Sequence, residues 1–209
     1  QASGVHRDSV TLARYALDGT VLGTAGRHPG PELFVFSDGG ATMAGRRTFG
    51  KDSHVAAAGD SYWFGSADDL SLRLHAADGR LLRIVRTHRP LRRVTSADID
   101  RVIASAGADD VLMRRMLAAA PPPDFFPAYQ QVVADSDGFV WVREYAEGDA
   151  PSAQWQVFDP DGRWLGKVTL PVPLTVTQIT HDEIVGVWRD DLDVEHVRVY
   201  RLARDPSGR

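Results

Sequence analysis

The chain contains no cysteine, no asparagine and only two lysines, Lys51 and Lys167, among its 24 Lys and Arg residues. Without cysteine, disulfide bonds and thiolate metal sites are excluded. No apolar run approaches the roughly 20 residues of a membrane-spanning helix, so no transmembrane segment is expected. A formal net charge of −4 gives no reason to expect nucleic acid as a partner.

Motifs of hydrolytic chemistry are missing as well. The sequence has no Gly-x-Ser-x-Gly turn, which exposes a nucleophilic serine in one large class of hydrolases. His54, which follows Ser53, is expected in a loop, and His75 is expected on a strand. The sequence leaves enzymatic activity open and favours a protein that does not catalyse a reaction.

What the chain does contain is a recurring β pattern, which is clearest from residue 132 to residue 170. Its aromatic and β-branched residues fit a pleated, half-buried surface. Asp137-Gly138 and Asp161-Gly162 lie between the apolar runs, and Asp-Gly tolerates the positive φ that a tight hairpin turn needs. The stretch therefore predicts four consecutive antiparallel strands, about 40 residues long, the length of a propeller blade.

The same order of strands and turns returns elsewhere in the chain. Residues 54–86 repeat it around Asp78-Gly79, and residues 179–208 repeat its outline with Trp188 in the place of Trp141. Residues 9–25 resemble only its second half. Tryptophan recurs in these strands, and we expect the five side chains in the core between blades rather than on a ligand platform: Trp63, Trp141, Trp155, Trp164 and Trp188.

Residues 97–119 break the β pattern. Their apolar residues follow helical spacing, Ser96 is a candidate N-cap, and Gly107 is expected to divide two short helices. The prolines at 121–123 then end the helical segment, because proline cannot donate the backbone hydrogen bond. We expect a helical and proline-rich insertion between blades at residues 97–128.

These patterns together predict an all-β fold. We expect three to four four-stranded antiparallel meanders, which must stack because one meander cannot bury its faces alone. The expected organisation is a single partial β-propeller domain over residues 1–209, part of a six-bladed propeller. The chain begins inside a blade, and its first residues show neither an initiator Met nor a signal peptide. We therefore expect it to be the C-terminal part of a longer protein.

Three stretches, residues 126–145, 157–171 and 184–202, resemble the C-terminal half of bacterial six-bladed β-propeller proteins of the NHL-like kind, found as envelope proteins in Gemmatimonadota-type bacteria. The resemblance covers approximately residues 55 to 204. It implies a fold and a periplasmic or extracellular location in the cell envelope. It implies no activity, because most of that family has none assigned.

The candidate ligand-binding residues lie in and after the insertion: Phe125, Phe126, Tyr129 and Arg143. An inserted helix with an apolar tail can cover one mouth of a propeller channel, where it caps a ligand pocket or offers a docking surface. We therefore expect a binding or scaffold module that holds a small ligand or a protein partner at its channel face. The chain could also be a subunit of a larger assembly.

A metal site is the second candidate. Asp191, Asp193 and Glu195 alternate, so on a strand their carboxylates would share one face and suit Ca²⁺; the alternative is a solvated edge with a hairpin loop. No other cofactor is expected. The alternative function is a metal-dependent lactonase or hydrolase whose site lies largely in missing N-terminal blades, since lactonases of this fold use asparagine among their ligands and the chain has none.

Overall fold

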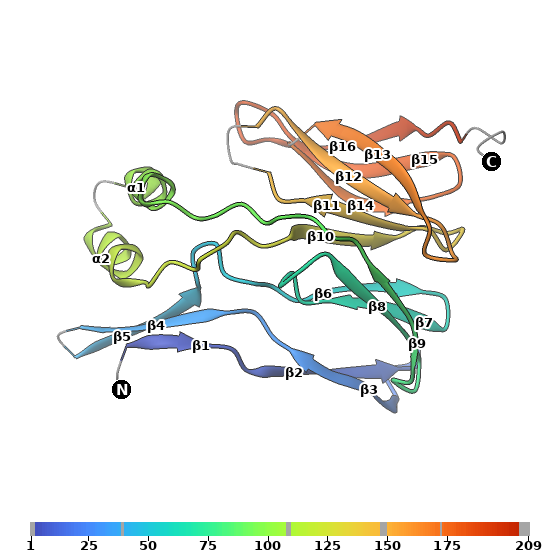
Figure 1. Cartoon of the computed structure of the whole chain (residues 1–209), viewed down its shortest axis with the longest axis horizontal. Helices are drawn as coiled ribbons and strands as arrows, with labels where there is room; N and C mark the ends of the chain where they lie inside the picture. The colour runs from blue at the N-terminus through green and yellow to red at the C-terminus, as the bar shows by residue number, and fades with distance from the viewer. Residues whose placement is uncertain (1–2, 39, 108–109, 147–149, 172, 205–209) are drawn as a thin grey trace. The chain divides into compact units, whose positions relative to one another are not determined.

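The chain folds into antiparallel sheets with one helical insertion, as the sequence predicts (Figure 1). The computed structural model describes residues 3–38, 40–107, 110–146, 150–171 and 173–204. These residues divide into two compact units. Neither helix among them is long and apolar enough to cross a membrane.

Unit 1 consists of residues 1–53, 66–70 and 87–128. One of its sheets has the strand order β1-β4-β5, and the other pairs β2 with β3 around a turn at Asp18-Gly19. The sequence did not predict β1, which is only three residues long. The strands are β1 (Gly4–His6), β2 (Ser9–Tyr15), β3 (Val21–Pro29), β4 (Leu33–Asp38) and β5 (Ala41–Arg46).

Both helices also belong to unit 1, and they are α1 (Ser96–Ser105) and α2 (Val111–Ala119). The N-cap of α1 is Thr95 rather than the predicted Ser96, because Thr95 and Asp98 form a reciprocal capping box. The helical segment packs on the β4–β5 hairpin through Phe34, Phe36 and Met116. Of the apolar residues at helical spacing, Met116 is buried, whereas Val111 and Leu112 are exposed, so the predicted apolar face is only partly covered.

Unit 2 consists of residues 54–65, 71–86 and 129–209 and contains three meanders. Two have four strands, as predicted, and the last has three among the residues that the structure describes. The first meander is β6 (His54–Ala58), β7 (Ser61–Gly65), β8 (Ser71–Ala76) and β9 (Leu81–Arg86). The second is β10 (Tyr129–Ala134), β11 (Val140–Glu144), β12 (Ser152–Phe158) and β13 (Trp164–Pro171). The third is β14 (Leu174–Ile179), β15 (Glu183–Arg189) and β16 (Glu195–Arg201).

The Asp-Gly pairs reverse the chain where the sequence places them. Gly79, Gly138 and Gly162 have φ of 87°, 86° and 81°, a backbone region that favours glycine. Each lies in the turn between two adjacent strands of a meander. The turns therefore set the strand lengths and the register of unit 2.

The three meanders of unit 2 stack on one another through their first strands, since β10 contacts both β6 and β14 (Figure 1). Between the second and third meanders lies a core whose largest buried members are Trp141, Trp155, Leu174 and Ile179. Trp63 is also buried, whereas Trp164 is 55% exposed. The prediction that tryptophan fills the core is therefore wrong for Trp164, because it lies on the outermost strand of its sheet.

The capping box of α1 predicts a pH dependence. Hydrogen bonds from the hydroxyl and backbone N–H of Thr95, with a smaller contribution from Arg92, lower the pKa of Asp98 to about 2 from its ordinary 3.8. A depressed pKa adds stability that is complete above the unfolded value, so it should be lost as the pH falls from 3.8 toward 2. The protection factors of the α1 amides, which are exchange rates corrected for the intrinsic pH dependence, should fall over this range. In Asp98→Asn this fall should disappear, and an unchanged pH response would contradict the prediction.

Candidate functional site

The four predicted ligand residues do not belong to one compact unit. Phe125 and Phe126 lie in unit 1, whereas Tyr129 and Arg143 lie in unit 2. Tyr129 and Arg143 stand at neighbouring ends of β10 and β11, where Tyr129 pairs with Glu144 and Arg143 with Gln131. Phe125 and Phe126 thus lie together, whereas Tyr129 and Arg143 lie on opposite faces of their sheet, and the four do not form one site.

Phe125 and Phe126 close the base of the helical insertion. The N–H of Phe126 donates to the Arg92 carbonyl at 3.0 Å, and Phe125 forms a β-bridge with Arg93. The guanidinium groups of Arg92 and Arg93 lie 4.0 and 4.8 Å from the ring centres of Phe126 and Phe125, respectively. The Nζ of Lys51 donates to the carbonyls of both phenylalanines at 2.9 Å. These contacts hold the two ends of the insertion side by side.

Tyr129 is a core residue. It is 1% exposed, its ring lies 5.2 Å from that of His54, and its hydroxyl donates to the Ser71 carbonyl at 3.3 Å. Gly65 makes room for it, since a Cβ at position 65 would lie 1.9 Å from the tyrosine hydroxyl. Tyr129 therefore joins the second meander to the first.

Arg143 differs from the other three residues. Its Nε is buried and has no hydrogen-bond partner among the residues that the structure describes. Burial lowers the pKa of its guanidinium. The residue faces the same side of the sheet as Trp155, its partner in the β11–β12 ladder. Of the four predicted residues, Arg143 is the one with a polar group left to offer a ligand.

The prediction that Asp191, Asp193 and Glu195 share one face of a strand is wrong. β16 begins at Glu195, so Asp191 and Asp193 lie in the preceding hairpin turn, where Asp193 has a φ of 60°. The carboxylates of Asp193 and Glu195 both pair with Arg189, at 2.8 and 2.5 Å. No group of three His, Asp or Glu side chains with metal-binding geometry occurs among the described residues. A calcium site stays a prediction without support from this turn.

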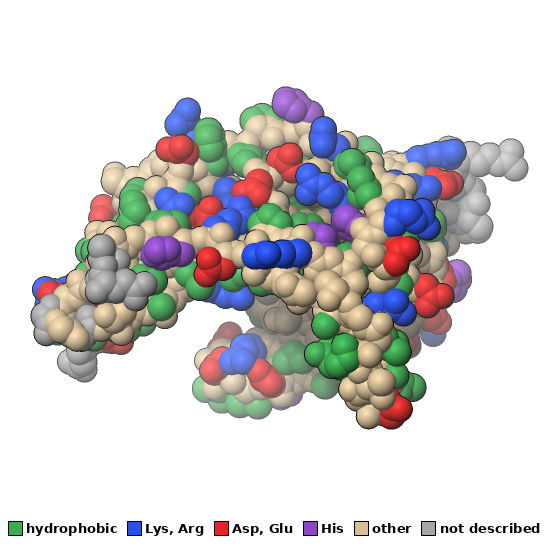
Figure 2. All heavy atoms as spheres, turned by 90° about the horizontal axis from the view of Figure 1, so that it is seen from below, with side chains coloured by type: hydrophobic (Ala, Val, Ile, Leu, Met, Phe, Trp, Pro, Cys, Tyr) green, Lys and Arg blue, Asp and Glu red, His purple; other side chains and the backbone are tan. Residues whose placement is uncertain are grey.

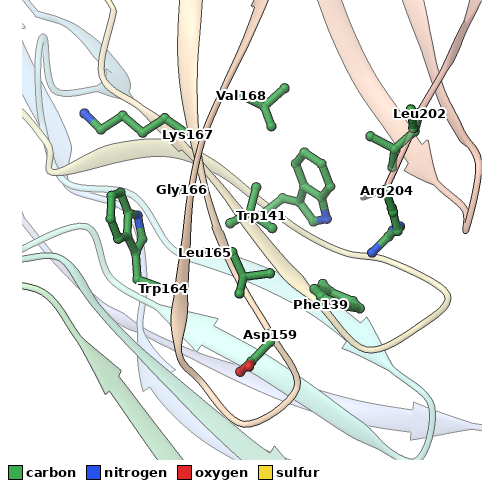
Figure 3. Close-up of a pocket in the computed structure, with 12 residues that line it drawn as sticks. Phe139, Trp141, Asp159, Trp164, Leu165, Gly166, Lys167, Val168, Leu202 and Arg204 are labelled. Atoms are coloured by element: carbon green, nitrogen blue, oxygen red, sulfur yellow. The ribbon is translucent and has the colours of Figure 1, made fainter. Parts of the chain in front are cut away.

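The structure shows a hollow that the sequence did not predict, a groove of about 690 Å³ beside β13 (Figure 3). We call it the β13 groove. Aromatic and aliphatic side chains dominate its lining, and Asp159 and Arg204 add charge. The apolar lining residues are Phe139, Trp141, Val157, Trp164, Leu165, Val168 and Leu202.

A bulge in β13 decides which side chains face the groove, since its ladder with β12 shifts register at Val157/Phe158. Leu165 and Val168 both project on the side of β13 that carries Trp141 and Phe139, whereas Trp164 and Lys167 border the groove from the other side (Figure 3). The Nζ of Lys167 pairs there with the buried Glu144 at 2.8 Å. The ammonium group of Lys167 thus points toward Glu144, and Leu165, which is 54% exposed, is the accessible apolar side chain of β13 on the Trp141 side.

One buried carboxylate organises the inner end of the groove. The side chain of Asp135 is fully buried, and its Oδ1 accepts the N–H groups of Asp137 and Phe139 at 3.0 and 2.8 Å. Its Oδ2 accepts the Trp141 indole N–H at 3.0 Å and pairs with Arg204 at 2.6 Å. Asp135 therefore holds the turn, the aromatic floor and the segment after β16 in one arrangement.

Arg204 completes this arrangement from the far end of the chain. Its Nε donates to the His181 carbonyl at 2.9 Å, and its guanidinium lies 4.5 Å from the Phe139 ring centre. The arginine is therefore committed to Asp135, to the backbone and to an aromatic face. It closes one wall of the groove, and its side chain is 21% exposed.

Sequence reasoning missed Asp135, Asp159 and Arg204. One signal was available, because the pattern Asp-x-Asp-Gly occurs at residues 135–138 and again at residues 159–162. The first Asp of each turn accepts backbone N–H groups, and both turns lie at the groove. No signal pointed to Arg204, which reaches its partner across 69 residues.

The comparisons with known proteins add no family. No family model matches the chain, and no curated protein matches it. The likeness to NHL-like propeller proteins thus rests on the three stretches in the sequence and stays a prediction.

The Asp135 network predicts an unequal cost for two similar substitutions. Asp135→Ala removes turn hydrogen bonds and leaves Arg204 and the Trp141 N–H without their acceptor, which should cost about 3 kcal/mol of unfolding free energy. Asp190→Ala removes the equivalent turn hydrogen bonds, from Leu192 and Val194, together with an exposed contact to His196 at 2.9 Å, and should cost about 1 kcal/mol. Urea unfolding of both variants gives the comparison. Equal losses would show that the pair with Arg204 adds no stability.

Proposed function

We propose that this protein is a non-catalytic binding module built from propeller-type blades, and that the β13 groove holds an apolar group of its ligand or partner. The stacking of three meanders through their first strands supports the blade architecture. A location in the bacterial cell envelope follows from the resemblance of the three sequence stretches and is part of the proposal.

The single observation that carries the binding role is the groove itself. Its volume falls within the range of roughly 300 to 1,000 Å³ that is usual for ligand pockets. Its floor is fixed before any ligand arrives, because Asp135 holds Trp141 and Phe139 in place. A preformed floor reduces the conformational entropy that binding would otherwise cost.

The lining indicates the chemistry of the ligand. Burial of apolar surface against aromatic and aliphatic side chains is favourable by about 25 cal/mol per Å². Arg204 is already paired with Asp135, so the inner wall offers little net charge. An aromatic or branched aliphatic group fits this lining best, whether it belongs to a small molecule or to a side chain of a protein.

The face drawn in Figure 2 favours neither nucleic acid nor an anionic membrane as the partner, because basic and acidic side chains are interspersed on it. A basic patch that could follow a phosphate backbone would instead gather one sign of charge. No specific observation favours the metal-dependent hydrolase.

The β13 groove can be tested with 8-anilinonaphthalene-1-sulfonate, a fluorescent probe with an aromatic body and one sulfonate. We expect the folded protein to bind the probe, with energy transfer from tryptophan, and Leu165→Gln to bind it about fivefold more weakly because one apolar contact is lost. Leu82→Gln is the matched control, since Leu82 is 43% exposed on the outer strand of the first meander.

Circular dichroism of both leucine variants should match that of the unchanged protein, because both side chains are substantially exposed. Equal weakening by Leu165→Gln and Leu82→Gln would mean that the probe binds apolar surface in general. That result would remove the groove as the binding site.

A further inference from the structure

The last strand of unit 2 has an open edge. β16 pairs with β15 along its whole length and has no strand on its other side among the described residues. In the first and second meanders the equivalent third strands, β8 and β12, are covered by β9 and β13. The outer N–H and C=O groups of β16 therefore form a row that can pair with another strand.

The side chains of β16 protect this edge only in part. The strand is seven residues long and contains neither proline nor lysine, and its ladder with β15 has no bulge. Val197 and Val199 are 75% and 55% exposed. Natural edge strands are protected by charge, proline or a bulge, and of these β16 has only the charges of Glu195, Arg198 and Arg201.

The charges at its two ends fit a second β16 that runs antiparallel. The strand begins with Glu195 and ends with Arg201. Within its own sheet Glu195 pairs with Arg189, and Arg201 lies opposite Glu183. If two copies pair about a two-fold axis through Arg198, Glu195 of each copy also faces Arg201 of the other, and Val197 faces Val199. This is the register that pairs all seven residues, and opposite charges placed directly across two strands stabilise the pair.

The same register places Arg198 opposite its own copy, and the structure shows how that repulsion is reduced. The guanidinium of Arg198 lies 4.0 Å from the ring centre of Trp188, which belongs to β15. The charge therefore leans inward over its own sheet and away from the open edge. A cation over an indole face is also stabilised by the ring quadrupole.

We propose that a second copy of this chain adds its β16 to the β16 edge, so that two three-stranded sheets become one continuous antiparallel sheet. The pairing is independent of the β13 groove. It uses backbone hydrogen bonds and one aliphatic ladder, which is a small interface, so we expect a dissociation constant in the range of roughly 10 to 500 µM.

Sedimentation velocity over a series of protein concentrations tests the pairing. The unchanged chain should convert from monomer to dimer as its concentration rises through this range. Val197→Lys places a charge on the edge and should abolish the dimer. Thr175→Lys is the matched control, because Thr175 lies on the same sheet face and in the same row as Val197 but on β14, the strand at the opposite edge of the same sheet. It should dimerise like the unchanged chain.

A crosslinking experiment tests the register, and the absence of native cysteine makes it clean. Because position 198 faces itself, Arg198→Cys alone should form a disulfide-linked dimer under mild oxidation, whereas Thr175→Cys should not. A chain that stays monomeric throughout the concentration series would overturn the proposal. Equal loss of the dimer in Val197→Lys and Thr175→Lys would also overturn it, because the sheet face rather than the edge would then be the contact.

Discussion

The second meander is apolar on both faces, and the packing of unit 2 depends on covering them. Along β11, Val140 and Val142 face one side of the sheet while Trp141 faces the other, and all three are buried. A strand buried on both faces needs a layer on each side. The first meander supplies one through contacts such as that of Tyr129 with Ser71, and the third supplies the other through Leu174 and Ile179. Stacking is therefore a requirement of the sequence of β11 itself.

The same constraint governs the polar groups that enter this layer. Glu144 is buried at the end of β11, where it accepts from Gln156 at 3.0 Å and pairs with Lys167. Asp135 is buried at the other end and has four donors. A buried charge is tolerated when its partners satisfy it, so each of these carboxylates also fixes the position of its neighbours. The rigid floor of the β13 groove is a consequence of the hydrogen bonds that Asp135 accepts.

Local signals explain which parts of the structure the sequence predicts. The Asp-Gly turns and the alternating aromatic strands depend on neighbouring residues, and the strands of both four-stranded meanders follow from them. The partners of Asp135 and Tyr129 lie up to 69 and 58 residues away, so neither could be assigned a role from its own surroundings. The prediction that Asp191 and Asp193 lie on a strand is wrong for a local reason. The carboxylate of Asp190 accepts the N–H groups of Leu192 and Val194. These hydrogen bonds form a hairpin turn in the segment for which simple alternation predicts a strand.

The exposed apolar residues of β13 and of β16 suit different partners. On β13, Leu165 borders a groove whose floor is already packed, so an apolar ligand group gains surface burial without any change of fold. On β16, Val197 and Val199 accompany backbone groups that lack a second strand, so an added strand gains hydrogen bonds as well as burial. Both β13 and β16 are the outermost strands of their sheets, so strand position alone does not distinguish them. The packed groove beside β13 makes its exposed apolar residues suit a ligand group, whereas the exposed valines of β16 accompany only the open strand edge.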